Sequence, residues 1–341
     1  MTEEQQKLFS SLHQGPPGRK LNDHILIVDG LNTMLRAFSS VTIVNPKGNN
    51  VGAISGFLRS LGSVVRQFNP TRVVVAWDGK GGATNRKYLN PNYKAQRDHA
   101  TILHWDLYDT KDEEKESVRA QAERITDYLA CLPVTYVQLP KVEADDIIAY
   151  IAKTASKGQH KVTIVSMDKD FMQLIDQNIR VYSPVRKTLF DYDAAKDFLG
   201  VLPENYNIIK AITGDKSDNL RGVKGAGVKT LVKIIPELLT DPNIDLPFIF
   251  DRCAELMEKK PLCAKMLSEW RTVQSNFELM DLHKSVLSDF EKTSVKNRLS
   301  EPINKIYTAP FIAMLEEDCI DSVSSDIENW LKMNFSGLLL E

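Results

Sequence analysis

The chain has 341 residues, with 43 basic and 45 acidic side chains and a formal net charge of −2. No apolar run approaches the roughly 20 residues that a membrane span needs, which excludes a membrane-embedded protein. The four cysteines are scattered, so we expect reduced thiols rather than a zinc site, and the polar N-terminus indicates a cytoplasmic protein.

The first two hundred residues predict an arm followed by an α/β domain. Residues 1–20 are polar, contain Gly15-Pro16-Pro17-Gly18, and should form a flexible arm. From 21 to 200, short apolar runs alternate with amphipathic stretches, which is typical of a mostly parallel sheet covered by helices. Strands are predicted at 25–28, 73–77, 134–139 and 162–165, and helices at 52–68 and 143–157.

Three further segments do not follow this alternation of strands and helices. Residues 79–125 are basic and then highly charged, and we expect an insertion beside the sheet edge that acts as a lid or arch. Residues 201–290 favour short helices broken by glycines, followed by a longer helical pattern. We expect the segment 291–341 to be a less regular tail, broken at Pro302 and Pro310.

Acidic residues stand where the predicted strands end. The carboxyl ends of parallel strands open onto one crevice, so acids from four segments should converge there. The loop GDKSDN adds two acids that are three residues apart and would share a face if the loop were helical. The full set is Asp29, Asp78, Glu143, Asp145, Asp146, Asp168, Asp170, Asp215 and Asp218.

Nine carboxylates in one cleft require cations. Two like charges about 4 Å apart repel by roughly 1–4 kcal/mol, depending on the effective dielectric constant. Carboxylate oxygens suit Mg²⁺, or Mn²⁺ in its place, and two such ions can activate a water and stabilise the departing oxygen of a phosphodiester. For any single acid the alternative is a helix cap or a turn, but a chance coincidence of all nine is disfavoured.

Basic residues gather in two stretches that contain no acid, 79–97 and 221–233, and such patches bind phosphates whatever the average charge. Tyr88 and Tyr93 offer surfaces on which unpaired bases could stack. The segment GVKGAGVKT allows a tight turn with exposed backbone N–H groups at a helix start. A solvated loop and an ordinary helix connection are the alternatives. The predicted DNA contacts are Lys80, Arg86, Lys87, Tyr93, Arg221, Gly222, Lys224, Gly225, Gly227, Lys229 and Thr230.

Six motifs, in chain order, resemble the 5′ nuclease superfamily: IVDG, AWDG, YKAQR, VEADD, SMDKD and GDKSDNLRGVKGAGVKT. This superfamily includes flap endonucleases, the 5′-nuclease domains of bacterial DNA polymerase I and, most similar, phage RNase H-type exonucleases. The resemblance covers residues 25–287 and implies a PIN-like 5′ nuclease fold with a helical arch and a helix–hairpin–helix.

The resemblance also implies a division of the acids between two or more Mg²⁺ ions. It places Asp29, Asp78, Glu143, Asp145 and Asp146 nearer the first metal, and Asp168, Asp170, Asp215 and Asp218 nearer the second. It further implies a K⁺ ion held by backbone carbonyls of the helix–hairpin–helix. Lys94 and Arg97 would orient or stabilise the scissile phosphate, and because they are three residues apart they would share a face of a helix.

The function implied is structure-selective hydrolysis of DNA and RNA–DNA hybrids at 5′ flaps, nicks and gaps, with removal of RNA primers in replication. The expected partners are branched or nicked duplex DNA, RNA–DNA hybrid and, through residues 291–341, a single-strand-binding or clamp protein; we expect a monomer. Two alternatives stay open. A PIN-like endoribonuclease would not need GVKGAGVKT, and a protein that only binds DNA structures would not need all nine acids.

Overall fold

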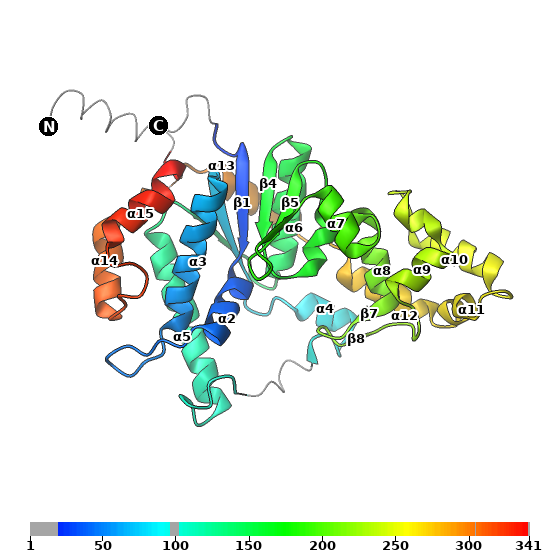
Figure 1. Cartoon of the computed structure of the whole chain (residues 1–341), viewed down its shortest axis with the longest axis horizontal. Helices are drawn as coiled ribbons and strands as arrows, with labels where there is room; N and C mark the ends of the chain where they lie inside the picture. Colours follow the sequence, from blue (N-terminus) through cyan, green and yellow to red (C-terminus); the bar gives the residue numbers. More distant parts are fainter. Residues whose placement is uncertain (1–19, 96–101, 304, 340–341) are drawn as a thin grey trace.

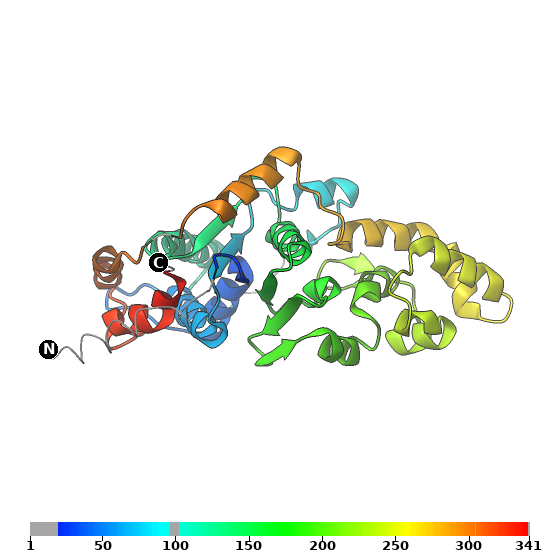
Figure 2. The same ribbon diagram turned by 90° about the horizontal axis from the view of Figure 1, so that it is seen from above.

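The computed structural model describes residues 20–95, 102–303 and 305–339. Within these ranges a six-stranded sheet lies at the centre of an α/β body, and a helical region extends from one side of it (Figure 1, Figure 2). Of the predicted N-terminal arm, only Lys20 belongs to the described residues. None of the described helices is both long enough and apolar enough to cross a bilayer.

The sheet confirms the predicted mostly parallel α/β class. Its strand order is β3-β2-β1-β4-β5-β6; β1 to β5 pair in parallel and β6 pairs antiparallel with β5. The sequence pattern predicts four of these strands but not β5 and β6. The bounds are β1 His24–Asp29, β2 Arg72–Trp77, β3 Thr135–Gln138, β4 Lys161–Val165, β5 Ile179–Ser183 and β6 Thr188–Phe190.

Helices cover both faces of the sheet, which explains why its strands are nearly continuous apolar runs. On one face α2 (Gly30–Ser40), α3 (Gly52–Phe68) and α5 (Lys111–Ala130) pack around Leu26 and Val28. On the other face α6 (Ala144–Lys157) packs around Ile25 and Ile27. The chain crosses from β1 to β2 and β3 on the first face and returns to β4 through α6, so the strand order reverses between β1 and β4.

The predicted arch is shorter than 79–125. Residues 111–130 form α5, the crossover helix between β2 and β3, and Ile125, Tyr128 and Leu129 are buried against the sheet. The Gln121 side chain accepts a hydrogen bond from the backbone N–H of Ala53 at 2.9 Å, which ties α5 to the start of α3. The preceding helix α4 (Thr84–Leu89) lies between the sheet and the helical region, where it contacts α12 (Figure 1).

The predicted helical region after residue 200 is present, and it contains a small hairpin. It shares the apolar cluster of the α6 face, which continues from Ile27 through Ile209 to Ile249. Its elements are η3 Pro203–Asn205, α8 Tyr206–Thr213, β7 Gly214–Asp215, β8 Leu220–Arg221, α9 Val228–Ile234, η4 Pro236–Leu239, α10 Leu246–Leu256, α11 Pro261–Ser268 and α12 Trp270–Met280. The helix α7 (Tyr192–Leu199) follows β6 and precedes these elements.

The segment after residue 290 is more regular than expected. It forms α13 (Asp289–Ser300), α14 (Thr308–Glu317), α15 (Ile327–Phe335) and the short η5 (Ser336–Leu338). Phe311, Leu331 and Phe335 are fully buried in the same cluster as α3 and α5. The expected loose tail is therefore a set of helices: α14 and α15 belong to the cluster of α3 and α5, whereas α13 joins the cluster of the α6 face (Figure 1).

Candidate active site

Acidic side chains gather at the carboxyl edge of the sheet, where the strand order reverses. Asp29 ends β1 and caps α2, accepting a hydrogen bond from the backbone N–H of Asn32 at 3.2 Å. Asp168 follows β4 and accepts from the N–H of Asp170 at 2.8 Å. Asp145 lies in the first turn of α6. This reversal point is where open α/β sheets bind their ligands.

These acids repel one another. Burial is the main cause that raises the pKa of Asp29 to about 7; hydrogen bonds from Ser166 and Asn32 oppose the rise, and the charges of Asp78 and Asp168 add to it. The pKa of Asp145 is also raised well above its usual value, by burial first and then by Asp168 and Asp29.

Among the described residues, no basic side chain forms an ion pair with Asp29, Asp145 or Asp168. The nearby charge of Lys94 opposes the rise for Asp145 only in part, so a cation near this edge would relieve the remaining repulsion.

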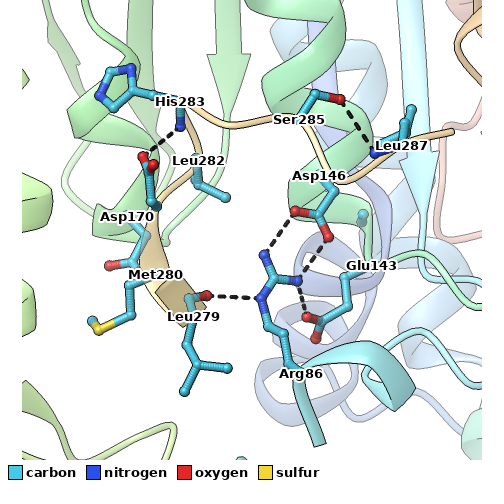
Figure 3. A network of polar contacts seen from close by, with 12 residues as sticks. Arg86, Glu143, Asp146, Asp170, Leu279, Met280, Leu282, His283, Ser285 and Leu287 are labelled. Atoms are coloured by element: carbon cyan, nitrogen blue, oxygen red, sulfur yellow. Dashed lines mark hydrogen bonds and ion pairs between the residues drawn. The ribbon is translucent and has the colours of Figure 1, made fainter. Parts of the chain in front are cut away.

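Two other acids of the predicted set are held by Arg86 instead of standing open to a metal (Figure 3). Its guanidinium binds both oxygens of Asp146 at 2.8 Å and also contacts Glu143. All three side chains are buried, with Arg86 only 9% exposed. Arg86 was predicted to contact DNA; that prediction is wrong in this arrangement, because the ion pairs bury its charge beside the acids.

Lys94 lies at the same cluster. Its ammonium contacts Glu143 at 2.5 Å and stands 4.9 Å above the ring of Tyr93. Burial lowers the pKa of Lys94, but the charges of Asp145 and Glu143 outweigh it and the net shift is upward. Lys94 occupies a turn with a positive φ of 55°, so the expected shared helix face with Arg97 does not begin there. Arg97 itself lies outside the described residues.

Tyr93 is a second correction to the predicted DNA contacts. Its ring is 2% exposed and packs with Leu220, Leu279 and Met280, so it supports Lys94 and offers no face for base stacking. The neighbouring Tyr88 is 89% exposed and keeps the stacking role open.

Lys210 joins two more of the acids, and sequence reasoning missed it. From α8 its ammonium lies 2.7 Å from Asp170 and also contacts Asp215. Burial raises the pKa of Asp170 to about 7 despite this partner, with Asp168 contributing. The pKa of Asp215 is lowered, because hydrogen bonds from Lys210 and Ser217 overcome the effect of burial. In the sequence, this contact is indicated by the position of Lys210, a single lysine in an apolar stretch about one helical turn before GDKSDN.

The last two acids of the set take part in local contacts. Asp78 follows β2 and accepts a hydrogen bond from the N–H of Ala144 at 2.9 Å, which fixes the start of α6. Asp218 lies in the turn between β7 and β8, and its carbonyl accepts from the N–H of Lys94 at 3.0 Å. The expectation of one helical face for Asp215 and Asp218 is wrong, because the segment is a hairpin.

The donor chemistry fits a hard divalent cation, since Asp29, Asp145 and Asp168 are neighbouring carboxylates that repel one another. In the part of the chain that the structure describes, however, no three acidic, histidine or cysteine side chains form a ready cage for one ion. Arg86, Lys94 and Lys210 pair with four other acids that the resemblance assigned to metals, namely Glu143, Asp146, Asp170 and Asp215. The metal-ligand roles therefore stay predictions.

Comparisons with known proteins place this geometry in a family. Residues 24–200 match the family model described as 5′-3′ exonuclease, N-terminal resolvase-like domain. A 5′-3′ exonuclease of Aquifex aeolicus is 32% identical over 221 residues, which is 64% of this chain and 71% of that protein. The chain belongs to the 5′-3′ exonuclease family. A 5′-3′ exonuclease of Bacillus subtilis is 33% identical over 229 residues, which is 64% of this chain and 72% of that protein.

The fold of this 5′-3′ exonuclease also matches a solved structure. A bacteriophage T5 flap endonuclease, in a pseudo-enzyme–product complex with DNA and metal ions, aligns with a TM-score of 0.62 at 22% identity, over 86% of this chain and 99% of that chain. The superfamily, the fold class and the enzyme class predicted from the motifs are confirmed.

The remaining predicted DNA contacts of this exonuclease lie mostly on its surface. After α8, the β7–β8 hairpin and a glycine turn lead into α9, and the turn places Gly225 at a φ of 95°. Gly222 is only partly exposed, and its role is in packing. A Cβ at this position would stand 2.0 Å from the carbonyl oxygen of Thr213, so the close approach of the two backbone segments requires a glycine. The exposed residues are Lys80, Lys87, Arg221, Lys224, Gly225, Gly227, Lys229 and Thr230.

Proposed function

We propose that this 5′-3′ exonuclease is a divalent-metal-dependent, structure-selective nuclease that hydrolyses DNA and RNA–DNA hybrids at 5′ flaps, nicks and gaps, and that it removes RNA primers in replication. The observation that supports this most is the group of mutually repelling acids Asp29, Asp145 and Asp168 at the reversal point of the sheet, where no described basic side chain forms an ion pair with them. The phage flap endonuclease that shares this fold was captured with DNA and metal ions, which supports the same proposal.

In this proposal Asp29, Asp145 and Asp168 hold Mg²⁺, with Mn²⁺ able to substitute. The bound metal would supply an activated water and charge stabilisation for the phosphodiester. Ser166 donates a hydrogen bond to Asp29 at 2.9 Å and so fixes the orientation of this carboxylate. Lys94 is held by its ion pair with Glu143 and by the ring of Tyr93. Its positive charge would stabilise the negative charge that develops on the phosphate in the transition state.

The DNA would be held on both sides of this edge. Lys224 and Lys229 are exposed around the glycine turn before α9 and can contact duplex phosphates without reading sequence. Lys80, Lys87 and Tyr88 are exposed beside α4 and suit a single strand, whose backbone the cations track while Tyr88 stacks on a base. We further propose a K⁺ ion on backbone carbonyls of the helix–hairpin–helix segment 222–230, a monomeric enzyme, and a clamp or single-strand-binding protein as partner of residues 291–341.

The test is product mapping with end-labelled 5′-flap, nicked and RNA–DNA hybrid substrates, with and without Mg²⁺. Asp145→Asn and Asp168→Asn should abolish cleavage and leave DNA binding largely intact, whereas Asp197→Asn, an exposed acid of α7, should cleave like the wild type. Full activity in both site variants would refute the proposal. Preferential cleavage of single-stranded RNA would favour the endoribonuclease alternative, and metal-insensitive binding without cleavage would favour a purely DNA-binding protein.

A further inference from the structure

One buried asparagine closes the base of the β7–β8 hairpin. Asn276, in α12, is 3% exposed. Its amide group donates one hydrogen bond to the carbonyl of Ala211, in the last turn of α8, at 3.0 Å, and another to the carbonyl of Arg221, in β8, at 2.9 Å. The last carbonyls of a helix have no partner within it, so that of Ala211 needs such a donor. Asn276 therefore ties the helix that leads into the hairpin to the strand that leaves it (Figure 1).

The hairpin held in this way supports the backbone around Lys94. The carbonyl of Asp218, in the hairpin turn, accepts a hydrogen bond from the N–H of Lys94 at 3.0 Å. The side chain of Asn219 donates to the carbonyl of Asn92 at 2.9 Å. Lys94 has a positive φ of 55°, which a residue other than glycine keeps only where its surroundings hold it. The position of Lys94 at the acidic edge thus depends on the hairpin.

The same end of α8 also holds the glycine turn that leads into α9. The N–H of Val223 donates to the carbonyl of Ile212 at 2.8 Å, and Gly222 approaches Thr213 so closely that a Cβ would not fit. Lys224, which we propose to contact the duplex, follows directly in this turn. The duplex-binding turn and the support of Lys94 are therefore joined where Asn276 bridges α8 and β8.

A second asparagine shows what the same bonding does elsewhere. Asn205 is fully buried in the helical region and donates its amide protons to the carbonyls of Leu238 at 3.1 Å and Asp241 at 2.8 Å. Both acceptors lie in or next to η4, outside the hairpin. Asn205 and Asn276 thus satisfy two backbone carbonyls each, but only Asn276 does so at the hairpin. Their comparison separates a general contribution to stability from a contribution to the active site.

We propose that Asn276 is a positioning residue, which holds the β7–β8 hairpin so that Lys94 stands at the acidic edge while the glycine turn binds the duplex. Because Asn276 is buried, it does not reach the DNA and acts through Lys94. The inference rests on the proposed nuclease function and deepens it.

The first experiment compares Asn276→Leu with the matched control Asn205→Leu. Leucine is similar in shape to asparagine but has no donor, so each variant leaves two buried carbonyls unpaired. Single-turnover cleavage of a 5′ flap by Asn276→Leu should slow about tenfold with little change in KM, because a small displacement of a catalytic group has a large effect on the rate. Asn205→Leu should cleave at the wild-type rate at a temperature where both variants are folded.

A double-mutant cycle tests whether the effect passes through Lys94. In the Lys94→Ala background, Asn276→Leu should slow cleavage by less than about twofold, because coupled residues do not act additively. Equal rates of Asn276→Leu and Asn205→Leu, or an undiminished tenfold loss in the Lys94→Ala background, would overturn the proposal. If Asn276→Leu does not fold, Asn276→Ser takes its place. Its hydroxyl can serve only one carbonyl, so the rate should fall about threefold, and a wild-type rate would overturn the proposal.

Hydrogen exchange gives a readout that needs neither DNA nor metal. Backbone amides of residues 214–221 should exchange about tenfold faster in Asn276→Leu than in Asn205→Leu, because the base of the hairpin is no longer held. Equal exchange in the two variants would overturn the proposal. A wild-type chain that does not cleave the flap would instead refute the proposed function, whatever the exchange of the hairpin, so the two failures are distinguishable.

Discussion

The metal-free protein should lose stability as the pH rises from 5 to 7. Burial raises the pKa of Asp29 to about 7, far above the usual value of 3.8. At pH 5 the folded state therefore keeps this proton, whereas the unfolded chain has released it. Because the folded group releases half of its proton by pH 7, the folding free energy falls by about 2 kcal/mol between pH 5 and pH 7. Asp170, whose pKa is also raised to about 7, acts in the same direction.

Urea denaturation in EDTA at pH 5, 6, 7 and 8 measures this effect, and Asp29→Asn isolates it. The half-buried His283, whose pKa is lowered, contributes with the opposite sign but is present in both proteins and cancels in the difference. Relative to the wild type, the variant should gain about 2 kcal/mol between pH 5 and 7. Saturating Mg²⁺ should remove most of this gain, because it favours the ionised carboxylate. A difference that does not change with pH would refute the reasoning.

Three further outcomes are expected. The double variant Lys224→Ala, Lys229→Ala should weaken duplex binding without base preference. In anisotropy titrations, the slope of log binding constant against log salt concentration should become shallower by about 0.9 for each lost contact, and an unchanged slope would argue against phosphate contacts. Lys94→Ala should lower the single-turnover rate about 10²-fold, and a loss confined to KM would contradict a transition-state role. Gly222→Ala should lower the melting temperature by several degrees. The control Gly227→Ala, whose Cβ would meet no atom within 4 Å, should melt like the wild type, and equal melting temperatures of the two variants would refute the packing argument.

The fold could be predicted where the pattern is local. The strands β1 and β4 and the helix α3 follow from uninterrupted β-branched runs and from helical periodicity, and each agrees with the predicted bounds to within a residue. The position of the acids follows from the same pattern, because a strand that ends in aspartate places it at the sheet edge. Asp29 and Asp168 were predictable for this reason.

The partners of the acids could not be predicted, because they come from distant parts of the sequence. Arg86 and Asp146 are sixty positions apart, and the basic stretch around Arg86 looks the same whether it faces solvent or a carboxylate. Exposure decides between a DNA contact and an internal ion pair, and exposure is a property of the whole fold. The hairpin that carries Asp215 escaped prediction for a different reason, since two-residue strands leave too short a pattern to separate from a helix turn.

The helices α14 and α15 have a consequence for how the enzyme forms. They place Phe311 and Phe335 into the apolar layer that α3 begins some two hundred and fifty residues earlier in the chain and that α5 extends. During synthesis this layer stays uncovered until the end of α15 has left the ribosome, although the whole sheet has been made long before. A nascent chain in that state exposes a large apolar surface and should engage chaperones.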